Sequence, residues 1–530
     1  MLLEIMDNFQ TFILLMFAAA ILVGISQRIN ISYPIGLVLG GAAIGFTPIK
    51  HGVNFDPNLI LLVVLPPILY YAAFEISFRE FKSNWKEILS LALGLVVFNT
   101  FVIGVIFHWI FPDLPWPLAF AFGAIISPPD AVATTAILKR FKINNKLLTI
   151  LEGESLINDA SALVLYKMAV VALLSGIFSL SEATTEFVFT VSGGILVGLI
   201  SGYILQNFSR IYLQPSVGVV FSFTIPYITY ICALYLDVSG VLAVVINGLI
   251  GAKILTKHHS SSRRILGYVA WDIFIILMNC FVFILIGLQL QTLTLTMSLQ
   301  QMLSYSGYAF LITVAMVAIR MAWVFAKSAF SYFKALQSSR AHRLCGQVLG
   351  ESILIGWAGM RGIVSLTAAL ALPYTYPNGS NLEGRKEVIF MVFIVILLSL
   401  LIPGLTLPLL IRKLKIHDQS ARHLLYKARK ELIEVAKKTI LHLHALKKIS
   451  DDECDLLKAH FDLNKRLLEL TDVGQIKAED LESAKSLVIK EQRKKLIEIW
   501  ERLEIDDKHL TELEQELDLE ETNMTRLELT

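Results

Sequence analysis

Long apolar segments recur along most of this chain, and they constrain its fold more than any other feature of the sequence. A transmembrane α-helix needs about 20 mostly apolar residues. Thirteen segments come close to this requirement, although the second and the ninth are short. They lie near 9–27, 33–48, 58–77, 88–111, 116–138, 147–176, 185–207, 216–236, 239–256, 267–290, 303–330, 350–373 and 387–411. The sequence therefore predicts an all-α polytopic membrane protein with about 13 transmembrane helices.

Charged residues divide the chain into two parts. Of all 530 residues, 55% are hydrophobic and 17% are charged, whereas soluble domains average about 25% charged residues. Residues 1–411 hold few charges, and residues 412–530 hold many, with apolar residues at helical spacing. We therefore predict a transmembrane domain over 1–411 and a cytoplasmic, charged, helical tail over 412–530. Tail helices are expected at 420–448, 452–470, 476–504 and 507–521, and the sequence indicates no partner for them.

Basic residues predict the orientation of the chain in the membrane. Lysines and arginines gather in alternate connections between the apolar segments. Such connections face the cytoplasm, which places the N-terminus outside and, after an odd number of spans, the tail in the cytoplasm.

The first apolar segment follows acidic Glu4 and Asp7 without a basic start, so a cleaved signal is not expected. A net charge of +2 provides no field that favours nucleic acid. We predict a multi-pass protein of the cell (inner) membrane.

The fifth segment carries two prolines and a carboxylate at membrane depth. It reads Ser127-Pro128-Pro129-Asp130-Ala131. Proline has no backbone N–H and clashes with the preceding helical turn, so the helix should break here. Broken helices persist in a membrane where they adjoin buried protein or a water-filled cavity. Because a simple kink needs no acid, we expect a functional break at the two prolines.

The sixth segment carries a polar stripe. Glu154 and Asn158 share one face of the predicted helix, and Ser155 and Asp159 share the adjoining face. Ionisable residues inside a membrane are costly and mark ion or proton pathways. Hard cations prefer the carboxylate, amide and hydroxyl oxygens that this stripe supplies. The stripe therefore predicts cation or proton binding.

The twelfth segment surrounds a buried arginine with glycines. Gly356, Gly359 and Gly362 lie around Arg361 and favour a second interrupted helix. A buried guanidinium needs a carboxylate, and Glu154 is the natural candidate for a bidentate, structural ion pair with Arg361.

The two interrupted segments are related by position. The fifth and twelfth segments are seven apart, and an odd offset reverses orientation in the membrane. Spans 1–6 and 8–13 are therefore expected to form inverted repeats, with span seven as the join. Asp130 in one break and Arg361 in the other can neutralise the half-helix ends that meet there. Arg320, in the eleventh segment, is expected to be a further structural charge.

At these residues the sequence resembles the monovalent cation:proton antiporter-1 family, the sodium/proton exchangers. The resemblance is carried by Leu65-Pro66-Pro67, by Phe122-Gly123 with Ser127 to Ala133, by Gly153 to Ala160, and by Gly359-Met360-Arg361-Gly362. The family implies a thirteen-helix fold with two crossed, unwound helices. It also implies a homodimer in lipid that exchanges Na⁺, or in some members Li⁺ or K⁺, for H⁺ by alternating access.

The resemblance also implies roles for single residues. Asp159 resembles the carboxylate that binds Na⁺ and H⁺, and Asp130 resembles the acid near the ion, so both are candidate Na⁺ ligands. Asn158 matches the Asn of the family's Asn-Asp pair, and Ser155 matches a hydroxyl ligand. Glu154 and Arg361 match the family's stabilising ion pair.

Four further residues are secondary candidates. Many family members have Thr-Asp-Pro where this chain has 129–131, so a threonine oxygen is absent, and either Thr134 or Thr135 is a candidate substitute. Asp272 and Asn279, in the tenth segment, resemble a polar helix of the family with a secondary role.

The predicted function is secondary active exchange of Na⁺ for H⁺, with no cofactor. Because Asn158 stands where a second acid could stand, a 1:1 electroneutral cycle is expected. A K⁺/H⁺ antiporter of the same fold remains an alternative, as does a cation channel, although channels use rings or repeated filter loops. An enzyme is not expected, because Ser155 has no histidine base at membrane depth in its own or the neighbouring segments. The four cysteines also lack a metal-binding spacing.

Overall fold

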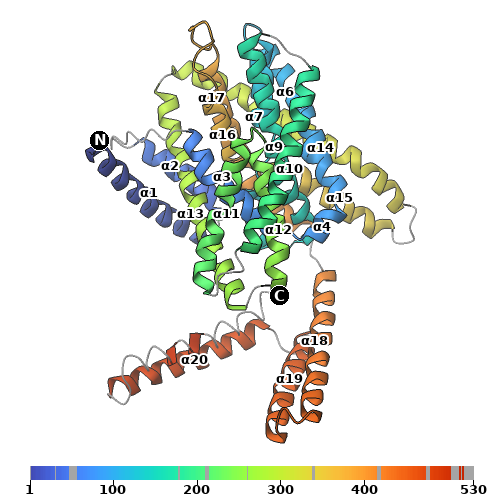
Figure 1. Ribbon diagram of the computed structural model, residues 1–530. Coiled ribbons are helices and arrows are strands. Elements are labelled where there is room, and N and C mark those ends of the chain that lie inside the picture. The colour runs from blue at the N-terminus through green and yellow to red at the C-terminus, as the bar shows by residue number, and fades with distance from the viewer. Residues whose placement is uncertain are drawn as a thin grey trace. The chain divides into compact units, whose positions relative to one another are not determined.

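A computed structural model describes residues 2–29, 31–46, 57–141, 143–176, 180–208, 214–258, 261–295, 297–336, 341–414, 419–472, 478–502, 513–514 and 516–518. The chain divides into two compact units, Met1–Ile416 and His417–Thr530. Both units are built from helices (Figure 1).

In its described ranges, the first unit consists of α-helices and one π-helical segment, η1, joined by connections. Its elements are α1 (Leu2–Arg28), α2 (Tyr33–Gly45), α3 (Pro57–Glu75), α4 (Phe78–Ser83), α5 (Trp85–Leu89), η1 (Ser90–Leu95), α6 (Val96–Ile110), α7 (Trp116–Ile126), α8 (Ala131–Arg140), α9 (Asn145–Ser175), α10 (Leu180–Phe208), α11 (Pro215–Tyr235), α12 (Gly240–His258), α13 (Ser261–Thr294), α14 (Leu299–Leu336), α15 (Ala341–Trp357), α16 (Ile363–Leu370) and α17 (Arg385–Leu414).

The lengths of these helices suit a membrane. Within the described ranges, eight helical stretches are long and apolar enough to cross a bilayer, and five further apolar helices are shorter. The short second and ninth predicted segments correspond to two of the latter, Tyr33–Gly45 and Gly240–Ile254. The prediction of an all-helical, polytopic membrane unit is confirmed.

The helices of the first unit form two groups. Helices α1, α2, α3, α10, α11, α12 and α13 pack mainly with one another and are called here the panel bundle. Segment η1 and helices α4 to α9 and α14 to α17 form the site bundle. Figure 1 shows α1, α2 and α13 on one side of the unit and α14 and α15 on the other. The bundles meet where α3 contacts α9 and α16, where α12 contacts α9, where α13 contacts α16 and α17, and where α2 contacts α17.

Glycines allow close helix packing within the panel bundle. A Cβ atom at Gly287 of α13 would overlap the carbonyl oxygen of Val38 in α2. A Cβ atom at Gly248 of α12 would likewise overlap the carbonyl oxygen of Tyr70 in α3. Membrane helices associate through such small residues. Each of these two pairs joins a helix from the first half of the unit to one from the second half.

The first interrupted helix breaks at its prolines. Helix α7 ends at Ile126, and α8 begins at Ala131. Pro128 and Pro129 lie between them and have no N–H group to continue the helical hydrogen bonds. Asp130 therefore has an extended backbone, with φ −96° and ψ 123°.

The second interrupted helix crosses the first. Helix α15 ends at Trp357, and α16 begins at Ile363 after an extended Gly362. The backbone N–H of Asp130 donates to the carbonyl oxygen of Met360 at 2.6 Å. This hydrogen bond joins the two breaks, and we call the joined region the crossing.

The second unit contains helices α18 (Gln419–Ala445), α19 (Asp451–Asp472) and α20 (Ala478–Glu501). Helices α18 and α19 pack together, and Lys465 and Glu434 form an ion pair between them at 2.8 Å. Ser450 and Glu453 form a capping box at the start of α19, with N–H···O distances of 3.3 and 2.7 Å. The hydrogen bonds from Ser450 lower the pKa of the exposed Glu453 carboxyl. The tail helix predicted over 507–521 lies mostly outside the described residues.

Candidate functional site

One half-buried carboxylate, that of Asp130, faces the N-terminal ends of two half-helices. Asp130 is the N-cap residue of α8, and its Oδ1 accepts a hydrogen bond from the Val132 N–H at 2.8 Å. A Cβ atom at Gly362, which precedes α16, would overlap Oδ2 of Asp130. Helix N-termini carry partial positive charge. Asp130 therefore compensates the ends of both α8 and α16.

A buried arginine compensates an opposite half-helix end. Nε of Arg361 donates to the carbonyl oxygen of Ile126, the last residue of α7, at 3.1 Å. Nη1 of Arg361 donates to the carbonyl oxygen of Gly359. Because helix C-termini carry partial negative charge, the guanidinium stabilises the end of α7 within the crossing.

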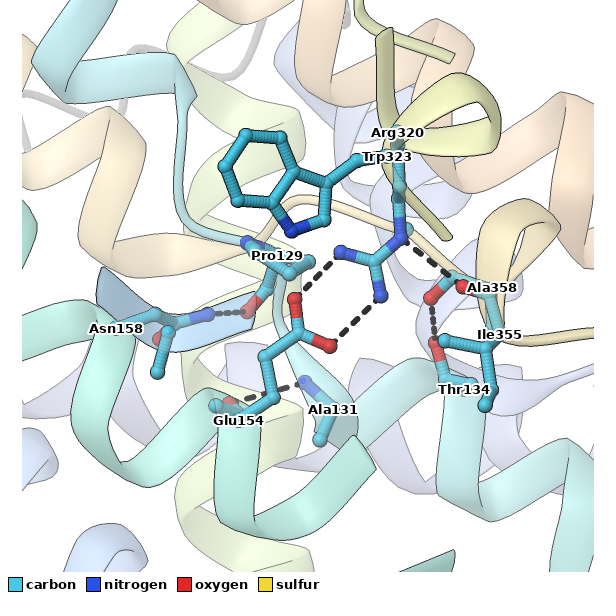
Figure 2. Close-up of polar contacts among 12 residues, drawn as sticks. Pro129, Ala131, Thr134, Glu154, Asn158, Arg320, Trp323, Ile355 and Ala358 are labelled. Carbon is cyan, nitrogen blue, oxygen red and sulfur yellow. Dashed lines mark hydrogen bonds and ion pairs between the residues drawn. The ribbon is translucent and has the colours of Figure 1, made fainter. Parts of the chain in front are cut away.

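The ion-pair partner of Glu154 is Arg320. Nη1 and Nη2 of Arg320, on α14, donate to the two carboxylate oxygens of Glu154 at 2.5 and 2.7 Å. Figure 2 shows this pair beside the carbonyl oxygen of Ile355, which accepts from Nε of Arg320 at 3.0 Å. Glu154 and Arg320 are each 1% exposed. The predicted pair of Glu154 with Arg361 is therefore wrong, because backbone carbonyls hold the Arg361 guanidinium.

Helix α9 presents its polar stripe to the first break. Nδ2 of Asn158 donates to the carbonyl oxygen of Pro129 at 2.9 Å (Figure 2). The hydroxyl oxygen of Ser155 accepts from the Ala131 N–H at 3.2 Å. Both bonds satisfy backbone groups near the break, where the helix is interrupted. Oδ1 of Asn158 is buried and, among the described residues, has no hydrogen-bond partner, so it is available to a ligand.

Asp159 lies next to Asn158 on α9 and is 7% exposed. In the part of the chain that the structure describes, its carboxylate has no hydrogen bond or ion pair, and its charged neighbour is Asp130. Burying an ionised carboxylate without a partner is costly. Asp159 is therefore a side chain that a proton or a cation would stabilise.

A small cavity adjoins the crossing. Its volume is about 10 Å³, close to the space that one water molecule needs. It is lined by Pro129, Asp130, Ala131, Thr134, Leu151, Glu154, Arg320 and Ala358. The cavity therefore leaves room for about one small species beside Asp130 and the Glu154–Arg320 pair.

The secondary candidates lie in different places. Thr134 belongs to the crossing, since its hydroxyl donates to a carbonyl oxygen of the second break, that of Ala358, at 2.9 Å (Figure 2). Asn279 is buried, and its Nδ2 donates to the Tyr33 hydroxyl at 3.4 Å. Asp272 is exposed and accepts a hydrogen bond from a tyrosine hydroxyl of α3. Asn279 and Asp272 both lie on α13 of the panel bundle, outside the hydrogen bonds of the crossing.

Two serines that support the site were missed by sequence reasoning. The hydroxyl oxygen of Ser399, on α17, accepts from the Arg361 N–H at 3.0 Å. The hydroxyl of Ser161, on α9, donates to the carbonyl oxygen of Ala92 in η1 at 2.7 Å. A π-helical turn displaces its carbonyls from the regular α-helical pattern, and Ser161 supplies a donor there. Ser399 is the one hydroxyl residue of the apolar run 388–405, which is a signal that could have identified it.

A family model described as "Sodium/hydrogen exchanger, transmembrane" matches residues 13–413. The chain belongs to the sodium/hydrogen exchanger family. This family consists of transporters, so the chain is a membrane transport protein rather than an enzyme, and the resemblance stated from the sequence is confirmed.

Three known proteins illustrate the relationship of this exchanger to others. The Na⁺/H⁺ antiporter NhaH of Halobacillus aidingensis is 30% identical over 77% of this chain and 98% of its own length. The sodium, potassium, lithium and rubidium/H⁺ antiporter of Bacillus pumilus is 30% identical over 72% of this chain, and the match spans 58% of that protein. The solved structure of the sodium proton antiporter MjNhaP1 from Methanocaldococcus jannaschii has a TM-score of 0.60 at 20% identity, covering 78% of this chain and 99% of that one. The exchanger therefore shares the fold of MjNhaP1.

Gly362→Ala is expected to disrupt the crossing of this exchanger. The added methyl group would displace either the Asp130 carboxylate or the start of α16, with an overpacking cost of about 1–3 kcal/mol. We expect lower thermal stability and slower Na⁺-dependent proton flux in proteoliposomes. Gly307→Ala is the matched control, because a Cβ atom at Gly307 on α14 meets nothing within 4 Å. Equal losses of stability and flux in both variants would contradict the expected role of Gly362.

Proposed function

We propose that this exchanger moves Na⁺ and H⁺ in opposite directions by alternating access, with Asp159 as the side chain that carries either ion. The observation that supports this most directly is the burial of Asp159 beside Asp130 without a partner in the described residues. Asp130, Ser155 and the open Oδ1 of Asn158 supply further oxygens of the kind that hard cations prefer. We propose Asp159 and Asp130 as the carboxylates that attract Na⁺.

Coupling would follow from competition between Na⁺ and H⁺ for Asp159. A bare, buried carboxylate is unfavourable, whereas a protonated or Na⁺-bound one is neutral. The site bundle would change the side it faces only with Asp159 loaded, because an empty site would carry an uncompensated charge through protein and lipid. Na⁺ delivered from one side is then exchanged for H⁺ from the other, and uncoupled leak of either ion is opposed.

The remaining charges of the crossing are assigned fixed roles. Asp130 is committed to the ends of α8 and α16, and Arg361 is committed to the end of α7. Glu154 and Arg320 neutralise each other between α9 and α14. With these charges constant, Asp159 is the exchangeable carboxylate. We therefore propose that one Na⁺ is exchanged for one H⁺ and that the cycle is electroneutral.

The topology that we propose has thirteen crossings built as two inverted repeats. Contacts between helices support this topology. If each span of the first repeat corresponds to the span seven positions later, α2 and α3 correspond to α12 and α13, and α6 and α7 correspond to α14 and α15. The contact between α2 and α13 then has its counterpart in the contact between α12 and α3, and the contact between α6 and α7 has its counterpart in that between α14 and α15. The distribution of lysines and arginines supports an external N-terminus and a tail in the cytoplasm. A homodimer in the cell membrane is proposed from the family resemblance.

K⁺/H⁺ exchange on the same fold is the second candidate. The Bacillus pumilus relative is named for sodium, potassium, lithium and rubidium, and oxygen ligands suit all of these ions. Pro129 stands where many family members have a threonine, so one hydroxyl ligand is missing and the ion range can differ from theirs. Na⁺ is proposed as the main substrate, with Li⁺ and K⁺ to be compared directly.

Proton flux in sealed proteoliposomes tests the proposed function. We expect added Na⁺ to dissipate a preset pH gradient, at a rate that does not change when the membrane potential is clamped to zero. Parallel additions of Li⁺ and K⁺ define the range of ions. Flux with K⁺ alone would keep antiport and change the substrate. A rate that depends on the clamp would contradict 1:1 exchange, and cation movement without proton movement would indicate a channel.

A further inference from the structure

Lys139 links the two bundles by an ion pair. Its Nζ lies 2.9 Å from Oε2 of Glu75 and 3.6 Å from Oε1 of Glu152. Glu75 ends α3 of the panel bundle, whereas Lys139 and Glu152 lie on α8 and α9 of the site bundle. The Lys139–Glu75 pair therefore bridges the bundles, and the Lys139–Glu152 pair stays within the site bundle.

The bridge is built on the same two helices as the ion site. Lys139 lies nine residues beyond Asp130, which caps α8, and Glu152 lies seven residues before Asp159 on α9. At about 1.5 Å of rise per residue, roughly 10–14 Å separates the bridge from the site along these helices. A movement of α8 and α9 away from α3, which would open a path to Asp159 at this end, must separate Lys139 from Glu75.

The strength of the bridge suits a contact that breaks and re-forms. The side chain of Lys139 is 47% exposed and that of Glu75 is 35% exposed, whereas that of Glu152 is 15% exposed. Partly exposed ion pairs stabilise a structure only modestly. Two carboxylates also share one ammonium here, so Lys139 keeps a partner in the site bundle when it leaves Glu75.

We propose that Lys139 is a positioning residue of the transport cycle, whose pair with Glu75 holds the site bundle closed against the panel bundle. The closure lies at the C-terminal end of α8, which is called here the α8 end. The pair opens when Asp159 faces that side. This inference rests on the proposed exchange at Asp159. Transporters with such folds alternate by moving one bundle against the other around a fixed site, and a contact present in one state alone shifts the balance between states.

The apparent KM for Na⁺, measured from each side of the membrane, tests this role. Lys139→Met and Glu75→Gln each remove the bridge, whereas Glu152→Gln leaves it intact. In everted and right-side-out vesicles, we expect both bridge variants to lower the KM from the side that the α8 end faces. They should raise the KM from the opposite side, by about two- to fivefold in each direction, because a more populated state binds its ion more tightly. Glu152→Gln should not show this opposed shift.

Charge reversal provides the rescue. Lys139→Glu combined with Glu75→Lys, in a Glu152→Gln background that avoids like charges, re-forms the bridge and should return both KM values toward those of Glu152→Gln alone. KM values for Na⁺ that shift in the same direction on both sides of the membrane would show a merely structural role and overturn the proposal. So would unchanged KM values in both bridge variants, or an opposed shift in Glu152→Gln.

A second measurement separates this inference from the proposed function. In a cysteine-free background, Val132→Cys in the first turn of α8 can be labelled with a membrane-impermeant maleimide from either side. Removal of the bridge should speed labelling from the side of the α8 end, even if the wild-type protein shows no Na⁺-dependent flux. Unchanged labelling would overturn the bridge, whereas absent wild-type flux with faster labelling would overturn only the exchange of Na⁺ for H⁺.

Discussion

Asp159→Asn is expected to reduce Na⁺-driven proton flux to the level of protein-free liposomes. The amide has nearly the same shape as the carboxylate, so the packing of α9 is preserved. It cannot take up a proton or neutralise a bound Na⁺, and both half-cycles therefore fail. Removal of a buried charge that has no partner among the described residues should leave thermal stability unchanged or higher. Flux assays and thermal unfolding of the same preparation check the two expectations together.

Asp272→Asn is the matched control for this experiment. Asp272 is an exposed carboxylate of the panel bundle, and asparagine keeps an oxygen that can accept the hydrogen bond from Tyr71. We expect this variant to retain flux close to that of the wild type. Flux that survives in Asp159→Asn would contradict the assignment of the ion-carrying side chain. Equal loss in both variants would show that the effect is not specific to Asp159.

Loss of either partner of the Glu154–Arg320 pair is expected to destabilise the protein strongly. Glu154→Gln leaves the guanidinium of Arg320 buried without a countercharge, and breaking a buried pair costs about 3–5 kcal/mol. Thermal or denaturant unfolding in detergent measures this loss. The double variant Glu154→Leu/Arg320→Met should recover much of the stability, because it leaves no unpaired charge.

A second double-mutant cycle identifies the partner of Glu154. In the structure, the Arg361 guanidinium donates to backbone carbonyls, so the coupling of Glu154 with Arg361 should be much smaller than its coupling with Arg320. Equal or larger coupling with Arg361 would support the pair expected from the sequence. The comparison is made by unfolding, so it does not depend on transport activity.

The breaks could be predicted because their causes are local. Pro128 and Pro129 remove two backbone donors wherever they stand in a helix, and the glycines around Arg361 are adjacent in sequence. The stripe on α9 was also readable, because positions four apart share a helix face whatever surrounds it. Such features need no knowledge of how the helices are arranged in space.

The partner of Glu154 could not be predicted, because two buried arginines were available. Which arginine pairs with Glu154 depends on which face of α14 turns toward α9. It also depends on the carbonyls of Ile126 and Gly359, which the crossing brings to Arg361. Hydropathy gives the length of a membrane helix but not its rotation. The bridge from Lys139 to Glu75 was missed for the same reason, since it joins α8 and α3, whose contact follows from the packing of whole bundles.

The hydrogen bonds of the crossing also bear on how the protein is made. Arg361 and the Ile126 carbonyl that it binds are 235 residues apart. The backbone N–H of Asp130 likewise has its hydrogen-bond partner, the Met360 carbonyl, in the later half of the unit. A chain synthesised from its N-terminus therefore places an acid and an interrupted backbone in the bilayer long before their partners emerge, at a cost that lipid does not relieve. The later half of the membrane unit thus supplies hydrogen-bond partners that the earlier half needs to complete its fold. A chain that stopped before residue 360 would keep the hydrogen bonds from α9 to the first break, but it would lack the partners of the Asp130 N–H and the Ile126 carbonyl.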